Sequence, residues 1–152
     1  MAPDNTADPD NAAVLKDVAR AWNSQDIDLL TSLFTKDCRY QDLALGETHR
    51  GRSGVRTFAE GVYETMPDFS LDFSEIDASE HFGATAWTIT ATWLGDYEGV
   101  DRTGTVVKFA GISRYRFADG LVSLNVDCWD SVQMIRQMRV LPSALTTIGG
   151  DR

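Results

Sequence analysis

The fold is decided by one stretch of the sequence, ISRYRFADGLVSLNVDCWDSVQMIRQM at residues 112–138. Residues 112–117 alternate, Asp119-Gly120 is a tight-turn pair, and residues 121–129 form a second strand, so the stretch predicts a β-hairpin. A period of two gives one face of the second strand five residues: Leu121, Ser123, Asn125, Asp127 and Trp129. The other face is apolar or thiol throughout: Val122, Leu124, Val126 and Cys128. Because the first face passes from apolar to acidic, it is typical of a strand that lines a pocket.

Helical spacing of apolar residues precedes this hairpin, and alternation takes over after Pro67. The spacing predicts helices over residues 14–22 and 29–34, the second N-capped by Asp26, and a third that Ser53 caps and Pro67 ends. Segments 46–54 and 95–104 have the composition of loops. Strands are expected at residues 38–42, 69–73, 87–93 and 105–117, and a final helix at 131–138. This order predicts an α+β fold, with helices on one face of a curved sheet of antiparallel strands.

Length and charge restrict the class of protein. The 152 residues fit one domain, which we place at 12–140, between a disordered acidic leader at 1–11 and a tail at 141–152. The net charge of −9 argues against a nucleic-acid partner, since phosphate binding needs a basic surface. No apolar run reaches the roughly 20 residues of a membrane span, so no membrane contact is expected. The start of the chain lacks the pattern of a signal peptide, which predicts a cytoplasmic location.

Cysteine and histidine spacing gives no sign of a metal site. Cys38 and Cys128 form no paired motif and are expected to be buried free thiols. His49 and His81 lie near Gly-containing turn segments and are not spaced as a ligand pair. We therefore expect no metal.

Asp127 is the leading candidate for a functional side chain, because a lone buried carboxylate is costly and tends to mark a site. The alternatives are an ion pair with Arg114 or Arg136, or simple exposure to water. Alternation in the strand at 38–42 places Tyr40 and Asp42 on one side. Asp42 is either a second pocket carboxylate or a turn residue, and Tyr40 is either a core aromatic or a catalytic donor.

Several neighbours of Asp127 have alternative roles. Asn125 shares its face and either orients a substrate carbonyl, holds the carboxylate or satisfies a backbone group. Asp130 directly precedes the last helix, which favours an N-cap. Trp87 and Trp93 share one face of their strand and serve either as core or as a stacking surface for a flat substrate.

Four sequence features together resemble the SnoaL-like polyketide cyclases of the nuclear-transport-factor-2-like superfamily. They are Trp22-Asn23-Ser24-Gln25-Asp26 at the end of the first helix, Arg39-Tyr40-Gln41-Asp42, Gly51-x-x-Gly54, and the last hairpin with its acid and Gln-Met. The resemblance covers roughly residues 12–140. It implies a cone-shaped α+β barrel, in which a bent antiparallel sheet wraps around three N-terminal helices and leaves a deep pocket. It also implies a homodimer.

The resemblance also assigns roles on the hairpin. In these cyclases an Asp seven residues after the hairpin glycine is the catalytic acid and base, and here that position is Asp127. They carry a His seven residues before the glycine, where this chain has Ser113, a small residue expected to make room for substrate.

A sister branch, the limonene-epoxide-hydrolase-like enzymes, is similar at residues 39–43. Those enzymes use a Tyr and an Asn there to hold the attacking water, and here Tyr40 and Asp42 stand at these positions. Asp127 again matches their acid on the last strand. They also require an Arg and a second Asp on a middle strand, whereas the matching residues 87–93 carry no charge.

These observations predict a cofactor-independent cyclase or isomerase of secondary metabolism that acts on a small polyketide-like molecule. Burial raises the pKa of an Asp toward the operating pH, which makes it a useful base. The predicted catalytic residues are Asp127, Asp42 and Tyr40, and the predicted substrate-binding residues are Asn125, Ser113, Trp129, Trp87, Trp93 and Phe58. The alternatives are opening of an epoxide by water or by a substrate hydroxyl, participation in a hydroxylation, and binding of a small molecule without catalysis.

Overall fold

A computed structural model describes residues 10–140 of the chain. Residues 1–9 of the predicted leader and the predicted tail at 141–152 lie outside the described part. The helices are α1 (Asn11–Ser24), α2 (Ile27–Ser32), α3 (Gly51–Thr65) and α4 (Ser131–Met138). The strands are β1 (Phe34–Asp42), β2 (Glu47–Arg50), β3 (Ser70–Ala78), β4 (Phe82–Thr92), β5 (Asp96–Tyr97), β6 (Val100–Asp101), β7 (Val106–Ala118) and β8 (Leu121–Trp129). None of the helices in residues 10–140 has the length and apolar character needed to cross a membrane.

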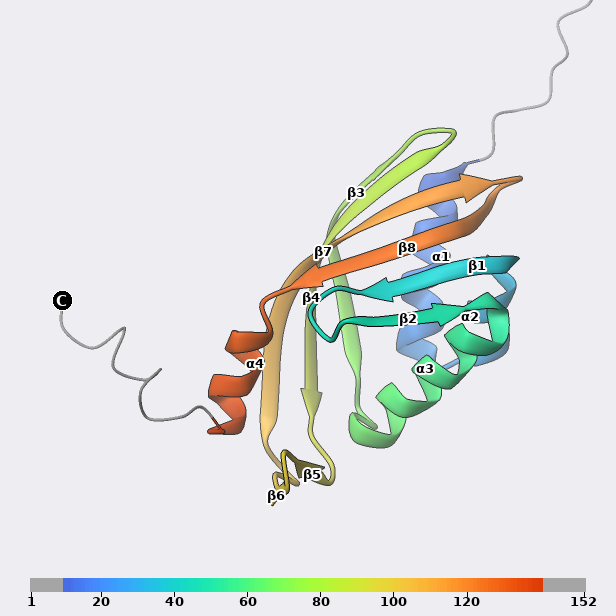
Figure 1. Cartoon of the computed structure of the whole chain (residues 1–152). Helices are drawn as coiled ribbons and strands as arrows, with labels where there is room; N and C mark the ends of the chain where they lie inside the picture. Colours follow the sequence, from blue (N-terminus) through green and yellow to red (C-terminus); the bar gives the residue numbers. More distant parts are fainter. Residues whose placement is uncertain (1–9, 141–152) are drawn as a thin grey trace, which may run out of the picture.

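Six strands form one curved sheet in the order β2-β1-β8-β7-β4-β3 (Figure 1). The α+β class and the curved sheet are confirmed. All neighbouring strands in it are antiparallel except β1 and β8, which pair in parallel. The prediction of a wholly antiparallel sheet is therefore wrong at this one pair. A parallel pair needs a long crossover connection, and here the whole of α3, β3, β4 and β7 lies between the two strands.

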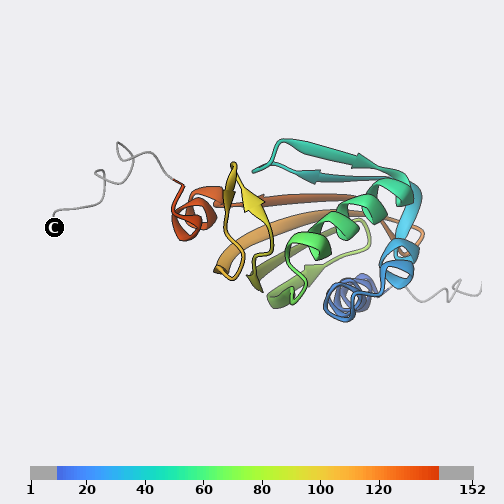
Figure 2. The same ribbon diagram turned by 90° about the horizontal axis from the view of Figure 1, so that it is seen from below.

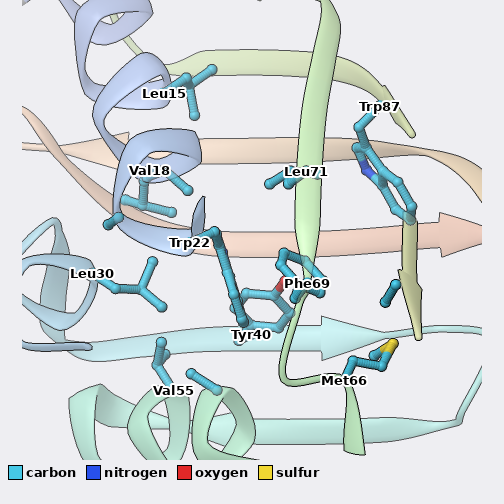
Figure 3. Close-up of a cluster of buried hydrophobic side chains, with 14 of the residues drawn as sticks. Leu15, Val18, Trp22, Leu30, Tyr40, Val55, Met66, Phe69, Leu71 and Trp87 are labelled. Atoms are coloured by element: carbon cyan, nitrogen blue, oxygen red, sulfur yellow. The ribbon is translucent and has the colours of Figure 1, made fainter. Parts of the chain in front are cut away.

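The N-terminal helices lie on one face of the sheet, with α1 against β3 and α3 against β1. The β5–β6 hairpin and α4 lie at the opposite end of the molecule from α1 and α2 (Figures 1 and 2). Apolar side chains from helices and strands meet between the layers, and Figure 3 shows Leu15, Val18 and Trp22 of α1 near Leu71 of β3. The Trp22 and Phe69 rings lie 5.4 Å apart between their centroids.

Helices α1 and α3 begin in different ways. Asp10 caps α1 by accepting the Ala13 backbone N–H, and buried Asn11 donates to the carbonyls of Ser79 and Glu80. By contrast, α3 begins at Gly51 without a side-chain cap, so the predicted Ser53 cap is wrong. Positive φ at Gly51 (65°) lets the chain turn directly from β2 into α3.

Segments predicted as loops contain more structure than composition suggested. Residues 46–54 hold β2 and the start of α3, and residues 95–104 hold the β5–β6 hairpin. Phe34, predicted at the end of the second helix, begins β1 instead. Cys128 is exposed rather than buried, while Cys38 is buried as predicted, and both are free.

A β-bulge at Ser123 changes which side chains of β8 face inward. Phe117 pairs with Val122 and Arg116 with Leu124, so Ser123 is the additional residue. Val122 is therefore fully buried on the inner face, where strict alternation had placed Leu121. Beyond the bulge the prediction of the inner face is confirmed, because Asn125 and Asp127 are buried and line the cavity.

Candidate active site

A cavity of about 380 Å³ lies between the helices and the inner face of the sheet. Its walls come from α1 and α3 on one side and mainly from β1, β2, β3, β4, β7 and β8 on the other. Every residue predicted for the site lines it: Tyr40, Asp42, Phe58, Trp87, Trp93, Ser113, Asn125, Asp127 and Trp129. The structure therefore brings the whole predicted set together, while the role of each residue stays a prediction.

Strand register explains why the polar members of this set converge. Asp42 of β1 pairs with Asp127 of β8, which in turn pairs with Ser113 of β7. In the neighbouring row, Tyr40 pairs with Asn125. Directly paired residues point to the same face of a sheet, so the parallel β1–β8 pair places both carboxylates at one end of the cavity.

The carboxylate of Asp127 accepts three hydrogen bonds. Oδ1 accepts from Ser113 Oγ (2.5 Å) and Asn125 Nδ2 (2.6 Å), whereas Oδ2 accepts only from the Tyr40 hydroxyl (2.6 Å). Since each carboxylate oxygen accepts about two hydrogen bonds, the remaining capacity is on Oδ2. Oδ2 is therefore the oxygen that can take a proton from a ligand.

Trp87 fixes the direction of the hydrogen bond from Ser113. Its Nε1 donates to Ser113 Oγ at 2.8 Å, and an indole N–H can only donate. Ser113 must then use its own proton toward Asp127. Ser113 is thus a hydrogen-bonded support for the carboxylate, and the prediction that it merely makes room was too narrow.

Burial raises the pKa of Asp127 from 3.8 to about 6, although the hydrogen bonds from Ser113, Tyr40 and Asn125 act in the opposite direction. The nearby charge of Asp42 adds a smaller upward contribution. Burial, followed by the charge of Asp127, raises the pKa of Tyr40 well above its usual range. Near neutral pH the site therefore holds an ionised base beside a protonated phenol.

The alternative partners of Asp127 do not contact it. Its side-chain hydrogen bonds within residues 10–140 go to Tyr40, Ser113 and Asn125, and none of the ion pairs in that range includes it. Neither Arg114 nor Arg136 neutralises the carboxylate. Its hydrogen-bond donors are all uncharged groups.

Asp42 combines the two roles that the sequence left open. Its Oδ1 accepts the Leu45 backbone N–H at 2.9 Å, which stabilises the turn after β1. Both oxygens also lie within 3.1 Å of Trp129 Nε1, so Asp42 fixes the indole that forms part of the cavity wall. Asp130, in contrast, accepts the backbone N–H groups of Val132 and Gln133 and caps α4, as predicted.

Gly111 packs against two of the cavity-lining indoles, and the sequence reasoning missed its role. A Cβ atom there would lie 2.5 Å from Trp87 Cζ2 and 2.7 Å from Trp129 Cβ. Glycine is therefore what allows both indole side chains to lie against β7. The available signal was a glycine inside an alternating strand, which often marks a close approach of another group.

Tyr115 and His49 also line the cavity and were missed. Tyr115 shares strand parity with Ser113, so alternation could have found it, and its hydroxyl lies 3.1 Å from Thr85 Oγ1. His49 was hidden in a segment predicted as a loop. Within the described range, no group of three or more His, Cys, Asp or Glu side chains is placed to hold a metal ion.

The curved sheet, its helical cover and the cavity between them define a nuclear-transport-factor-2-like fold, which solved structures share. The chain belongs to the SnoaL-like polyketide cyclase family, whose sequence model matches residues 12–138. This membership supports a cyclase role in secondary metabolism.

One relative and two solved structures show what the chain is similar to. The chain is 27% identical to cyclase aurE of Calcarisporium arbuscula over 113 residues, which cover 74% of this chain and 80% of that protein. AclR from Streptomyces galilaeus has a similar fold, with a TM-score of 0.76 and 24% identity, covering 90% of this chain and 100% of that one. IdmH from Streptomyces antibioticus also gives a TM-score of 0.76, at 21% identity, covering 86% of this chain and 99% of that one.

Proposed function

We propose that the protein closes a ring in a neutral, polyketide-like substrate by acid–base catalysis at Asp127, without a cofactor. The observation that carries the proposal is the position of Asp127 Oδ2, the carboxylate oxygen with spare capacity, in a largely aromatic and apolar cavity beside the Tyr40 hydroxyl. Asp42 and Asp127 at the same end of the cavity disfavour an anionic substrate, because like charges repel at close range. A neutral ester or ketone meets no such repulsion.

The reaction that suits this geometry is an intramolecular aldol closure. Asp127 Oδ2 removes a proton from a carbon between two carbonyls, and the substrate delocalises the resulting enolate. Once Asp127 is protonated, the Tyr40 hydroxyl is free to donate to the enolate oxygen. The apolar walls hold the reacting carbons close together and exclude water, which favours closure over hydrolysis.

Epoxide hydrolysis receives less support than ring closure. The residues lining the cavity in the described part of the chain include neither Arg nor Lys, and the hydrolase mechanism requires an Arg. Asp42 is already engaged by the turn and by Trp129. Epoxide opening, participation in hydroxylation and binding without catalysis stay predictions.

The pH dependence of base catalysis tests the role of Asp127 without knowledge of the natural substrate. Nitrobenzisoxazole opens when a base removes one proton from carbon, and its product absorbs visible light. A base acts only when ionised, so kcat/KM should rise with pH, reach half its maximum near pH 6 and then level off. A half-maximum near 3.8, the ordinary value for Asp, would show that the reacting carboxylate is a solvated one instead.

We also propose that the protein forms a homodimer, as the family resemblance implies, through the outer face of the sheet. Ile112 of β7 is 60% exposed on that face, and Leu43, which lines the same outer groove, is 59% exposed. Ile112→Asp should weaken dimer formation by about tenfold or more, because a carboxylate would replace a buried apolar contact. Light scattering across a dilution series measures this, with Val100→Asp, an exposed position on the separate β5–β6 hairpin, as the control. A wild-type protein that is monomeric at all concentrations would contradict the proposal.

A further inference from the structure

His49 lies in the wall of the cavity, on the edge strand β2. It pairs directly with Tyr40 of β1, so the two side chains point to the same face of the sheet. Its ring stacks on Phe58 of α3, with 4.6 Å between the centroids and an angle of 29° between the planes. The side chain is 20% exposed, which makes it accessible from the cavity but confined by its neighbours.

Glu47 holds one nitrogen of this imidazole. His49 Nε2 lies 3.1 Å from Glu47 Oε2, and Glu47 follows the same strand parity as His49. Among the hydrogen bonds of the described residues, Nε2 is engaged and Nδ1 is not. A carboxylate on one ring nitrogen and a free second nitrogen are the arrangement of a proton-transferring histidine.

We propose that His49, oriented by Glu47, is the second catalytic residue and protonates the oxygen on which negative charge develops as the ring closes. This inference rests on the proposed ring closure at Asp127. The backbones of β2 and β8 are separated by two strand spacings, about 10 Å, so the base and the imidazole lie on either side of Tyr40. A fused-ring substrate spans such a distance and contacts both groups.

The polar neighbours are less suited to this step. Ser113 must direct its proton to Asp127, because Trp87 donates to its oxygen. Both oxygens of Asp42 already accept hydrogen bonds, from the Leu45 backbone N–H and from Trp129 Nε1. Histidine is the residue type that exchanges a proton near neutral pH.

Every proton that moves in this step has a donor and an acceptor. Asp127 Oδ2 takes a proton from the nucleophilic carbon, which forms a C–C bond with the acceptor carbonyl carbon. The π electron pair of that carbonyl moves to its oxygen, which takes a proton from the protonated imidazole of His49. The carboxyl proton of Asp127 then returns to the imidazole through water at the cavity mouth, so that the net change moves one proton from carbon to oxygen.

Two reactions separate the roles of His49 and Asp127. The first is ring closure of a planar aromatic ketone that carries a β-keto methyl ester side chain, which needs both a base and an acid. The second is opening of nitrobenzisoxazole, whose stable phenolate product needs only the base. His49→Gln should slow the first reaction about a hundredfold and the second far less, so that the ratio of the two rates falls by about tenfold or more. His81→Gln is the matched control, because His81 is 68% exposed and lies outside the cavity lining.

The outcomes separate the proposed acid, His49, from the proposed base, Asp127. Equal ring closure by His49→Gln and the wild type would overturn the role of His49, while loss of both reactions in an Asp127 variant would still support the proposed base. If the wild type does not close the ester, the imidazole is tested by nuclear magnetic resonance with isotope-labelled histidine and benzoylacetone, a neutral planar diketone. His49 ring resonances that shift on addition of the diketone, while those of His81 stay fixed, support the contact. Unchanged His49 resonances overturn it.

Discussion

Asp127→Asn is expected to lower kcat for ring closure and for nitrobenzisoxazole opening by about a thousandfold. The amide cannot accept a proton, yet it has nearly the same shape as the carboxylate. The amide oxygen can still accept hydrogen bonds from Ser113 and Asn125. The amide nitrogen can donate a hydrogen bond to the Tyr40 oxygen once the Tyr40 hydroxyl proton has rotated away. The cavity and the affinity for a neutral ligand should therefore stay unchanged within about threefold.

The same substitution should stabilise the protein at high pH. Because the folded-state pKa of Asp127 is raised from 3.8 to about 6, the native state favours the protonated form. The stabilising contribution of the neutral acid is complete below the unfolded pKa and is lost as pH rises through 6. A shift of this size corresponds to about 3 kcal/mol, and after the altered hydrogen bonds we expect a gain of about 1–3 kcal/mol at pH above 7.

Urea denaturation at two pH values measures this gain. The difference in the free energy of unfolding between Asp127→Asn and the wild type should be clear above pH 7 and small below about pH 4. Asp130→Asn is the control, since Asn also caps helices and position 130 lies outside the cavity lining. An Asp127→Asn protein that retains turnover would refute the proposed base, whatever its stability.

Gly111→Ala is expected to lower both stability and activity, although it adds a single methyl group. The new Cβ would lie 2.5 Å from Trp87 Cζ2, so the Trp87 indole must move. Its Nε1 would then lose the hydrogen bond to Ser113 Oγ. Ser113 would then no longer be held as a donor to Asp127. We expect a loss of about 1–3 kcal/mol in the free energy of unfolding and a fall of about tenfold or more in kcat.

Gly61→Ala provides the matched control for Gly111→Ala. Gly61 lines the cavity, and a Cβ there would have no neighbour within 4 Å. Since Gly61 lies inside α3, alanine should stabilise the helix by up to about 1 kcal/mol. Urea denaturation, tryptophan fluorescence and nitrobenzisoxazole opening compare the two variants. Equal behaviour of both would contradict the role assigned to Gly111.

Local periodicity was sufficient to predict the order of the main elements and the pocket-facing side of two strands. Tyr40 and Asp42 share a face by parity alone, and so do Asn125 and Asp127 beyond the bulge. These predictions succeed because alternation along a strand is a property of neighbouring residues. The meeting of Tyr40 with Asp127, in contrast, depends on which strands are neighbours.

The features that could not be predicted depend on strand register and on distant partners. The bulge at Ser123 is required by the pairing of β7 with β8, and nothing in the local residues signals it. The role of Ser113 follows from an indole on β4, and that of His49 from the pairing of β2 with β1. Charged and polar residues hid β2, because an edge strand needs little apolar sequence.

The parallel pairing of β1 with β8 has a consequence for how the protein folds. Tyr40 and Asp127 are 87 residues apart in the sequence, and so are Asp42 and Trp129. During synthesis β8 is the last strand of the sheet to leave the ribosome. It must insert between β1 and β7, which are not neighbours in the sheet and are connected only through β8. Pairing over such long loops is slow, so the chain passes through states that expose the edges of both strands. No nascent or partly folded form can carry the complete site, and activity can appear only when the last strand has entered the sheet.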